Sequence, residues 1–268
     1  MTDCFRWHPD ARLFEGTGRQ VPLNGRGGAV ASDTAQGLAS VIGHPAFRIG
    51  APEAPVPEPG SVPLLETLTS GSTGAARRIR RTQASWIASF QVNARMGIGP
   101  DAKVAVLGRL VQSLALYGAI EGLHLGAEVH LLSDLRPDRQ ARALAARRIS
   151  HLYASPAQLR LLTEAAVPCP DLRLVLVGGS KLDVTLRRSL ADMAPTAEIR
   201  EFYGAAETSF ITIADASAPE ASVGRAYEGV QISVDESGEV WVKSPYLFMG
   251  YATTEGGAKW RDGWLSVG

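Results

Sequence analysis

The chain has 268 residues, 45% of them hydrophobic and 20% charged, which is enough apolar material for one large or two smaller globular domains. Lys and Arg number 27, as do Asp and Glu, so the formal net charge is zero and no global field would recruit nucleic acid or a membrane surface. No apolar run is long enough to cross a bilayer, the N-terminus is polar and the two cysteines stand far apart, so we expect a cytoplasmic protein.

The first 63 residues predict local structure but no chemistry. We expect a short helix near residues 34–42. Five prolines between residues 51 and 63 predict an extended linker or surface strap that is poor in backbone donors. His8 and His44 each precede a proline, and we expect them to be turn residues rather than ligands.

A hydroxyl-rich loop follows at residues 69–74, with the sequence Thr69-Ser70-Gly71-Ser72-Thr73-Gly74. Its glycines let the backbone approach a ligand and turn N–H groups inward, and its hydroxyls add donors, a combination that suits a polyanion. Four arginines lie in residues 77–81, and a helix expected from Thr82 would place the loop upstream of a helix N-terminus. The alternative is a surface turn followed by a solvated charge run.

Two other functional loops are excluded at this position. A nucleotide P-loop requires G-x-x-x-x-G-K-[ST], but residues 75–77 after Gly74 read Ala-Ala-Arg. A hydrolase nucleophile elbow requires G-x-S-x-G, and neither Ser72 nor Ser180 has glycines at that spacing.

From residue 82 onward, helical and strand patterns alternate. We predict helices over 82–97, 110–125, 137–148, 156–165 and 183–193, and strands over 103–107, 127–132, 150–154, 172–177 and 198–202. The alternation predicts an α/β fold whose largely parallel sheet is flanked by helices on both faces. Ligands of such sheets bind beyond the carboxyl ends of the strands, which favours a site near residues 178–180 and 203–207, although a tight turn and an exposed cap would also fit these stretches.

The pattern changes after about residue 211. Alternating strands over 230–234 and 239–243, joined by the turn residues 235–238, predict a small, mostly antiparallel β subdomain. We expect Trp241, Trp260 and Trp264 in its core and seams. The predicted organisation is therefore an N-terminal segment (1–63), an α/β core (64–213) and a β-rich subdomain (214–268).

Several of these stretches, in this order, resemble the signatures of the adenylate-forming superfamily, which contains acyl- and aryl-CoA synthetases, the adenylation domains of peptide synthetases and luciferases. Residues 69–74 resemble its TSGSTG phosphate loop, residues 174–180 its strand ending in Gly-Gly-Ala, and residues 202–207 its Y-G-x-T-E stretch. Later matches are Ser222-Val223-Gly224-Arg225, Gly238-Glu239-Val240, Gly250-Tyr251 and Asp262-Gly263-Trp264.

The resemblance implies an ATP-dependent ligase in which an acid attacks the α-phosphate of ATP, pyrophosphate leaves, and the acyl group of the acyl-adenylate passes to CoA or a carrier-protein thiol. It implies ATP and Mg²⁺ as cofactors, and the short front of the chain is similar to ligases that activate small aromatic, hydroxybenzoate-like acids. The implied catalytic residues are Thr73, Arg77 and Glu207, with Glu207 as the magnesium ligand. The implied ATP-binding residues are Thr69, Ser70, Gly71, Ser72, Thr73, Gly74, Gly178, Gly179, Ser180, Glu201, Phe202, Tyr203, Gly204 and Glu207. The implied acid-binding residues are Tyr203, Gly204, Val111, Gln112 and Leu116.

This sequence departs from the family pattern in several places. Arg77 stands at the position of the phosphate-loop lysine, and Ala206 at that of the threonine in Y-G-x-T-E. Val111 or Gln112 stands at the position of a common histidine. The sequence ends at Gly268, so the chain resembles the large N-terminal lobe without the mobile C-terminal lobe that carries the catalytic lysine, and we expect weak activity from the chain alone.

Two further hypotheses remain beside the ligase. The departures also fit a catalytically degenerate nucleotide-binding or scaffold module on the same fold. The arginine run could bind nucleic acid, but the zero net charge and the lack of interleaved aromatic residues argue against that hypothesis.

Overall fold

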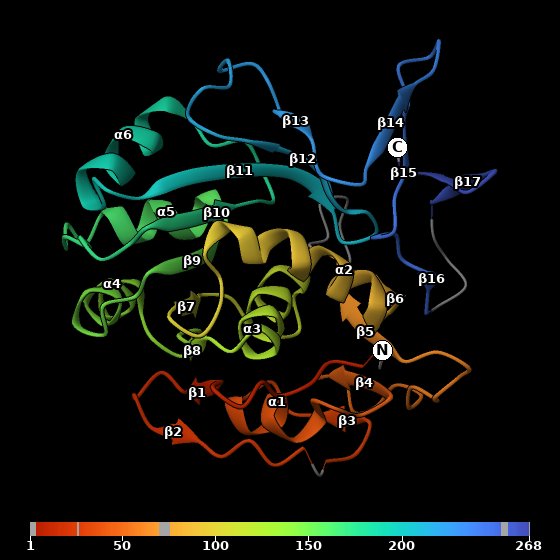
Figure 1. Cartoon of the computed structure of the whole chain (residues 1–268), viewed down its shortest axis with the longest axis horizontal. Coiled ribbons are helices and arrows are strands. Elements are labelled where there is room, and N and C mark those ends of the chain that lie inside the picture. The colour runs from red at the N-terminus through yellow and green to blue at the C-terminus, as the bar shows by residue number, and fades with distance from the viewer. Residues whose placement is uncertain (1–3, 26, 70–75, 253–256, 268) are drawn as a thin grey trace.

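The computed structural model describes residues 4–25, 27–69, 76–252 and 257–267, which form three sheets, with helices packed around the main one (Figure 1). In the main sheet nine strands follow the order β13-β12-β11-β10-β9-β7-β8-β1-β2. Its parallel centre consists of β11 (Glu198–Ala205), β10 (Leu174–Val177), β9 (His151–Ala154), β7 (Lys103–Val106), β8 (Glu128–Leu131) and β1 (Arg12–Phe14). The antiparallel edges are β12 (Ser209–Ala214) with β13 (Arg225–Ala226), and β2 (Gln20–Val21). The predicted, largely parallel sheet is thus confirmed.

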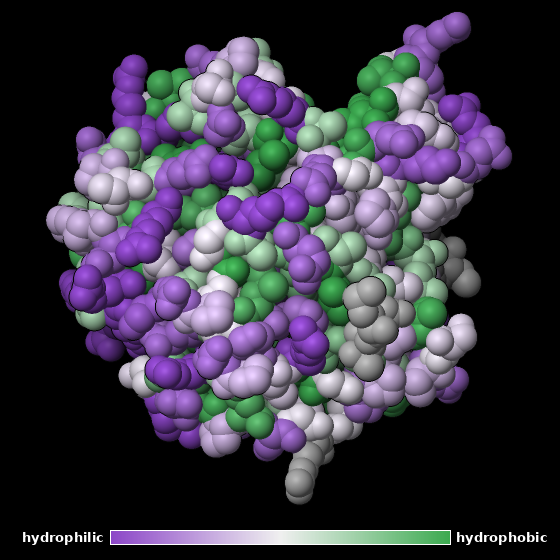
Figure 2. Space-filling view, viewed as in Figure 1, coloured by the Kyte–Doolittle hydropathy of each residue, from purple (hydrophilic) through white to green (hydrophobic). Residues whose placement is uncertain are grey.

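Helices cover both faces of this sheet. The side chains of successive strand residues point to opposite faces. Val104 and Val106 of β7 accordingly pack with residues of α1 (Ala35–Val41), α2 (Gln83–Asn93) and α3 (Ser113–Leu125). Ala105, between them, packs with residues of α4 (Pro137–Ala146), α5 (Pro156–Thr163) and α6 (Val184–Met193). Hydrophilic side chains cover much of the outer surface over α4 to α6 (Figure 2).

The predicted helices all form, with shorter bounds at several ends. Thr82 caps α2, because its side chain accepts a hydrogen bond from Ser85 N. The predicted helix over 82–97 is α2 followed by the 3₁₀ turn η1 (Ala94–Met96), which ends at Gly97 in a left-handed conformation. The helix predicted from residue 110 begins only at Ser113.

A second, five-stranded sheet was not predicted. Its order is β16-β6-β5-β4-β3, with β16 (Gly250–Tyr251), β6 (Arg78–Thr82), β5 (Leu64–Leu68), β4 (Ala46–Ile49) and β3 (Val30–Ala31). The helix predicted from Thr82 forms as α2, downstream of the hydroxyl-rich loop as expected, and the unpredicted strand β6 lies between the loop and that helix. Because β6 lies inside a sheet, the hypothesis of a solvated charge run is wrong for its buried member, Arg81.

A buried ion pair lies at the centre of this second sheet. Arg48 Nη1 donates to Glu66 Oε2 at 2.8 Å, and both side chains are 2% exposed. Arg80, whose side chain is 42% exposed, pairs with the other Glu66 oxygen at 2.7 Å. The Arg48 guanidinium also donates to the carbonyl oxygens of Gly50, Ala51, Ala54 and Pro55, and so holds the start of the proline-rich segment against the sheet.

The third sheet is the predicted antiparallel subdomain, with the order β14 (Gln231–Val234), β15 (Val240–Lys243), β18 (Trp264–Ser266) and β17 (Lys259–Arg261). Trp241 is buried as expected, whereas Trp260 is 48% exposed and stacks on Phe248. Strand pairing crosses both predicted domain boundaries, since β4 pairs with β5 and β16 pairs with β6. In the part of the chain that the structure describes, no helix combines the length and hydropathy needed to cross a membrane.

Candidate active site

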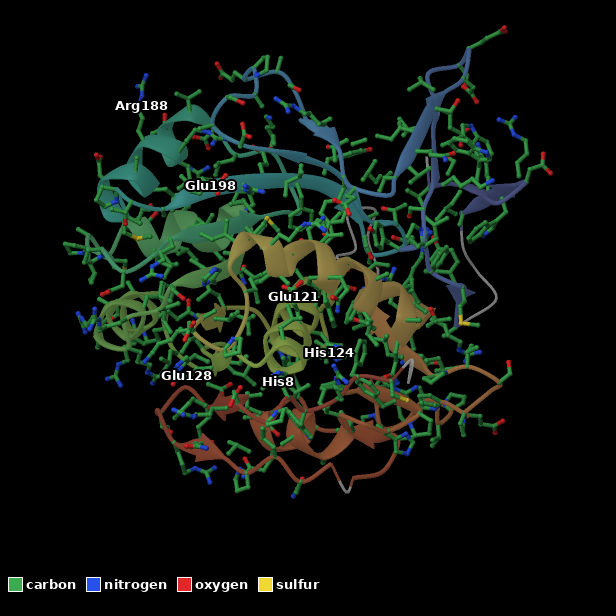
Figure 3. The ribbon with its side chains drawn as sticks, in the orientation of Figure 1. His8, Glu121, His124, Glu128, Arg188 and Glu198 are labelled. Carbon is green, nitrogen blue, oxygen red and sulfur yellow. The ribbon has the colours of Figure 1, made fainter. Side chains whose placement is uncertain are left out.

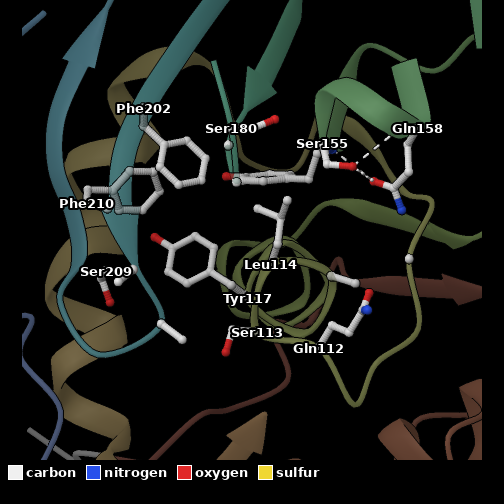
Figure 4. Close-up of a pocket in the computed structure, with 18 of the residues that line it drawn as sticks. Gln112, Ser113, Leu114, Tyr117, Ser155, Gln158, Ser180, Phe202, Ser209 and Phe210 are labelled. Carbon is white, nitrogen blue, oxygen red and sulfur yellow. Dashed lines mark hydrogen bonds between the residues drawn. The ribbon is translucent and has the colours of Figure 1, made fainter. Parts of the chain in front are cut away.

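A cavity of about 390 Å³ opens where several parallel strands end (Figure 4). The residues that follow the carboxyl ends of β7, β9, β10 and β11 contribute to it, as the topology of the sheet predicts. Helices α2 and α3 close the other sides. The lining residues are Trp86, Gly108, Gln112, Ser113, Leu114, Ala115, Tyr117, Tyr153, Ser155, Ala157, Gln158, Gly178, Gly179, Ser180, Phe202, Gly204, Ala205, Ala206, Ser209 and Phe210.

Glycines bring backbone to the edge of this cavity. A Cβ on Gly178 would lie 2.1 Å from the Phe202 ring, and a Cβ on Gly204 would lie 1.9 Å from the Ser209 carbonyl oxygen. Gly179 has a φ of +99°, a conformation that side chains disfavour. These positions therefore require glycine for local packing or backbone conformation, and Gly179 is exposed, so its backbone can be approached by a ligand. The structure brings together Gly178, Gly179, Ser180, Phe202 and Gly204 of the predicted nucleotide site.

Aromatic rings form one wall of the cavity. Phe202 and Phe210 have ring centroids 4.6 Å apart, Tyr117 and Phe210 5.4 Å, and Trp86 and Tyr117 5.2 Å. Figure 4 shows Phe202, Phe210 and Tyr117 around one side of the cavity, with Ser155 and Gln158 on the other. The capping box of α5 fixes both residues: the Ser155 side chain accepts a hydrogen bond from Gln158 N, and the Gln158 side chain accepts one from Ser155 N. These two hydrogen bonds hold this side of the cavity in place.

Behind the aromatic wall lies a buried carboxylate. Glu121 of α3 is 0% exposed and sits between α2 and α3 at the centre of the molecule (Figure 3). Asn93 Nδ2 donates to Glu121 Oε1 at 2.8 Å, Tyr117 donates to the same oxygen at 3.0 Å, and Tyr153 donates to Oε2. Burial raises the pKa of Glu121 to about 7, and these three hydrogen bonds act in the opposite direction.

A buried guanidinium lies behind another part of the lining. Arg81 of β6 is 0% exposed. Its Nη1 donates to Ser209 Oγ at 2.6 Å, and its Nη2 donates to the carbonyl oxygens of Ala206 at 2.9 Å and Tyr246 at 3.2 Å. The guanidinium carbon lies 5.2 Å from the centre of the Trp86 ring. Burial lowers the pKa of Arg81 to about 9, so the group remains charged at neutral pH.

The predicted metal ligand, Glu207, lies beside this guanidinium. Its side chain is largely buried, and its Oε1 accepts a hydrogen bond from the Tyr251 hydroxyl at 3.0 Å. The guanidinium carbon of Arg77 lies 5.7 Å from the centre of the Tyr251 ring. Among the described residues, no group of three or more His, Cys, Asp or Glu could hold a metal ion. One carboxylate fits Mg²⁺ that takes most of its ligands from phosphates and water.

The hydroxyl-rich loop is described only at its borders. Thr69 N donates to the Arg77 carbonyl oxygen at 2.9 Å, and Arg77 N donates to Thr69 Oγ1 at 3.0 Å, so these residues close the base of the loop. The predicted phosphate-binding residues Ser70, Gly71, Ser72, Thr73 and Gly74 lie outside the described residues.

Seven of the predicted site residues that the structure describes lie outside the lining of the cavity: Glu207 and the loop-border residues Thr69 and Arg77, described above, and four others. Glu201 lines a smaller cavity of about 150 Å³, where Lys181 and Arg187 pair with it. Tyr203 is 44% exposed and lies between two lining residues of β11. The remaining two are Val111 and Leu116. Ala115 and Tyr117 of α3 face the cavity, whereas Leu116, which lies between them, is fully buried in the core. Gln112 lies in the lining, as predicted.

The sequence analysis missed Arg81, Glu121 and Tyr153. A signal existed for Glu121, because it is the one carboxylate in a helix whose other residues are mostly apolar or small. Arg81 stands two residues after the buried Ile79, so in a strand both side chains point to the same face and both are buried. The clustering of four arginines hid this pattern.

The geometry agrees with the family relationship found by sequence comparison. A model of the family described as AMP-binding enzyme matches residues 18–252. The chain therefore belongs to the AMP-binding enzyme family, and the resemblance to adenylate-forming enzymes is confirmed.

Individual relatives are similar over the same region. The chain is 31% identical over 220 residues to the uncharacterized acyl-CoA ligase YhfT of Bacillus subtilis, covering 76% of this chain and 45% of that protein. It is 27% identical over 207 residues to the putative long chain fatty acid-CoA ligase VraA of Staphylococcus epidermidis, covering 75% of this chain and 45% of that protein. The chain thus spans about half the length of the curated relatives it matches.

Solved structures share the fold at lower sequence identity. O-succinylbenzoate coenzyme A synthetase (MenE) from Bacillus subtilis, in complex with ATP and magnesium ion, aligns with a TM-score of 0.67 and 20% identity over 76% of this chain and 46% of that chain. Amide bond synthetase McbA from Marinactinospora thermotolerans aligns with a TM-score of 0.65 and 24% identity over 82% of this chain and 49% of that chain. These similarities confirm the fold of the large lobe.

Proposed function

We propose that this chain is the ATP- and acid-binding lobe of an AMP-forming ligase, which joins a small aromatic acid to the thiol of CoA or a carrier protein in the cytoplasm. The observation that carries the proposal is the cavity at the carboxyl ends of the parallel strands, with exposed glycine backbone on one side and aromatic rings on the other. Membership of the AMP-binding enzyme family and the acyl-CoA ligase names of its relatives support it.

The nucleotide would bind on the glycine side of the cavity. Residues 178–180 and Gly204 offer backbone groups for the base and ribose, and the exposed ring of Tyr203 offers a stacking surface. Glu207 would hold Mg²⁺, whose chemistry here is to bridge and neutralise phosphate oxygens. Residues 69–74 and Arg77 would bind the β- and γ-phosphates.

The acid would bind against the aromatic wall. Tyr117, Phe202 and Phe210 line the cavity, and their rings offer it apolar surface on which an aromatic ring could pack offset or edge to face. The rings are packed against one another, which favours a short, flat acid over a long flexible chain. The lobe would place the acid carboxylate and the α-phosphate in contact, since positioning and charge stabilisation dominate such transfers.

A catalytically degenerate nucleotide-binding module is the second candidate. Ala206, in place of a hydroxyl residue, and Arg77, in place of lysine, favour it. Exchange of labelled pyrophosphate into ATP separates the two candidates when it is measured on a chain extended beyond Gly268 with a panel of aromatic acids. Acid-dependent exchange supports the ligase, and its absence with every acid supports the degenerate module.

Calorimetric titration tests the nucleotide site directly on the 268-residue chain. We expect ATP to bind with an affinity that increases when Mg²⁺ is present. Replacing Glu207 by Gln keeps the Tyr251 contact possible but removes the charge, so it should weaken the magnesium-dependent binding by about tenfold and leave magnesium-free binding almost unchanged. No binding of ATP at millimolar concentration would contradict the proposed function.

A further inference from the structure

The burial of Arg81 has an unusual feature, which is the lack of a matching negative charge. The guanidinium is 0% exposed, and no carboxylate among the described residues forms an ion pair with it. Its Nη atoms bind neutral oxygens, and its Nε has no hydrogen-bond partner in the described part of the chain. Burying a charge without a paired counter-charge costs several kcal/mol in general, so a specific reason for its presence is expected.

The position of Arg81 supplies that reason, because three residues that it contacts line the larger cavity. Ser209 and Ala206 accept its hydrogen bonds, and Trp86 lies beneath its guanidinium plane. The positive charge therefore lies one side-chain layer behind the part of the cavity wall formed by these residues. The guanidinium itself is 0% exposed, so the effective dielectric constant around it is low and its field is screened less than that of a surface charge.

Two titratable groups from neighbouring elements face Arg81, and neither forms an ion pair with it. Tyr117 of α3 and Glu207 of the loop after β11 are its titratable neighbours. Tyr117 is neutral at ordinary pH, because burial raises its pKa well above the usual value. The Glu207 carboxylate accepts a hydrogen bond from Tyr251, and its charge stabilises the Arg81 cation from a distance without pairing with it.

We infer that Arg81 is a positioning residue that favours an anionic oxygen group, a phosphate or a carboxylate, in the cavity beside Trp86, Ala206 and Ser209. This inference rests on the proposed function, in which the α-phosphate of the nucleotide and the carboxylate of the acid meet in this cavity. Arg81 acts through the field of its charge and through the carbonyl groups that it orients. It does not touch the ligand.

The test separates the charge of Arg81 from its structural contacts. Arg81→Lys and Arg81→Gln both lose the forked hydrogen bonds to Ser209, Ala206 and Tyr246, but only Arg81→Lys keeps the charge. The ligand pairs are AMP with adenosine and benzoate with benzamide, because each pair differs by one anionic group. Affinities are measured by calorimetry, and thermal unfolding checks that each variant is folded.

The inference expects the wild-type protein to prefer the anionic member of at least one pair. In Arg81→Gln this preference should fall by about tenfold, while adenosine or benzamide binds as before, and Arg81→Lys should retain most of it. A loss with the AMP pair alone identifies the phosphate as the favoured anion, and a loss with the benzoate pair alone identifies the carboxylate.

Arg48 provides the matched control. It is the other fully buried arginine of the second sheet, but Glu66 neutralises it. Arg48→Gln should lower the melting temperature without changing either preference. Equal losses for the charged and neutral ligands in Arg81→Gln would overturn the inference. If Arg81→Gln does not fold, Arg81→Lys decides, because loss of the preference in a folded Arg81→Lys protein would also overturn it. Failure of the wild-type protein to bind any of the four probes would instead contradict the proposed function.

Discussion

Arg48 and Arg81 are both fully buried arginines of the same sheet, but their surroundings differ. Arg48 pairs with Glu66 and holds the proline-rich segment through four carbonyl groups. Arg81 binds neutral oxygens and lies behind the lining of the candidate active site. The comparison indicates two different roles for a buried charge. A charge that has an ion-pair partner stabilises local structure, whereas a charge that has no such partner and lies next to a cavity is a candidate for favouring a bound ligand.

Glu121 extends the comparison with a charge of opposite sign. It is buried on the other side of Trp86 and Tyr117, and three neutral groups bind it. Two of these groups, Tyr117 and Tyr153, line the cavity. Glu121 therefore fixes the Tyr117 and Tyr153 rings, and Arg81 places a positive charge behind another part of the lining.

The largest expected effect is at the buried ion pair between Arg48 and Glu66. Replacing Glu66 by Ala leaves Arg48 buried without its counter-charge, so we expect the free energy of unfolding to fall by about 3–5 kcal/mol. Chemical denaturation measures this change. A loss below about 1 kcal/mol would show that the carbonyl groups alone stabilise Arg48, and would remove the distinction between the two arginines.

The second effect concerns Glu121 and pH. Because its pKa is raised to about 7 in the folded protein, the folded state binds a proton that the unfolded chain releases near pH 4.5. The stability that Glu121 contributes is therefore largest below about pH 4.5 and is lost as the pH rises to about 7, by about 3 kcal/mol in total.

Glu121→Gln isolates this contribution from the other titrating groups. The stability of the wild-type protein relative to Glu121→Gln should decrease between pH 4.5 and 7 and stay constant above that range. Urea denaturation of both proteins at several pH values measures the difference. A difference that does not change with pH would mean that Glu121 remains ionised throughout the range.

A smaller effect is expected at Tyr153. Tyr153→Phe removes the hydroxyl that donates to Glu121 Oε2 and leaves that oxygen without this partner. We expect a loss of about 1–3 kcal/mol at pH 8 and a smaller loss at pH 5, because the ionised carboxylate needs the donor more. Urea denaturation of the wild-type protein and Tyr153→Phe at the two pH values measures the loss. An equal loss at both pH values would show that the contribution of this hydroxyl does not depend on the ionisation of Glu121.

The smallest effect is expected at Arg80. Its side chain is 42% exposed, so solvent screens its ion pair with Glu66. Arg80→Ala should lower the free energy of unfolding by about 0.2–1 kcal/mol and leave the AMP-to-adenosine preference unchanged. A larger loss would indicate that both Arg48 and Arg80 are required to stabilise the buried Glu66 carboxylate.

The sequence predicted the main sheet well, because each strand and helix of the region from residue 103 to 202 has a local pattern of its own. The second sheet could not be predicted in the same way. Its strands β3 and β16 have two residues each, and their pairing joins segments that are far apart in the sequence. Such short strands gain their stability from tertiary packing rather than from intrinsic propensity.

The sequence analysis predicted the backbone segments that form the candidate site, but it missed the buried charged residues behind them. Glycine-containing stretches such as 178–180 have local signatures, and the topology of the sheet brings them together. The roles of Arg81 and Glu121 depend on what surrounds them in three dimensions. Arg81 is in contact with residues more than 120 positions away, which no local pattern encodes.

A crystal structure with 5′-O-(N-benzoylsulfamoyl)adenosine, a stable analogue of an aryl-adenylate, would test the account most directly. The account predicts that adenosine lies against residues 178–180 and Gly204, that the benzoyl ring lies against Tyr117, Phe202 and Phe210, and that the sulfamoyl group lies beside Ala206. A cavity closed by the protein's own side chains, or the analogue bound at another place on the molecule, would contradict it.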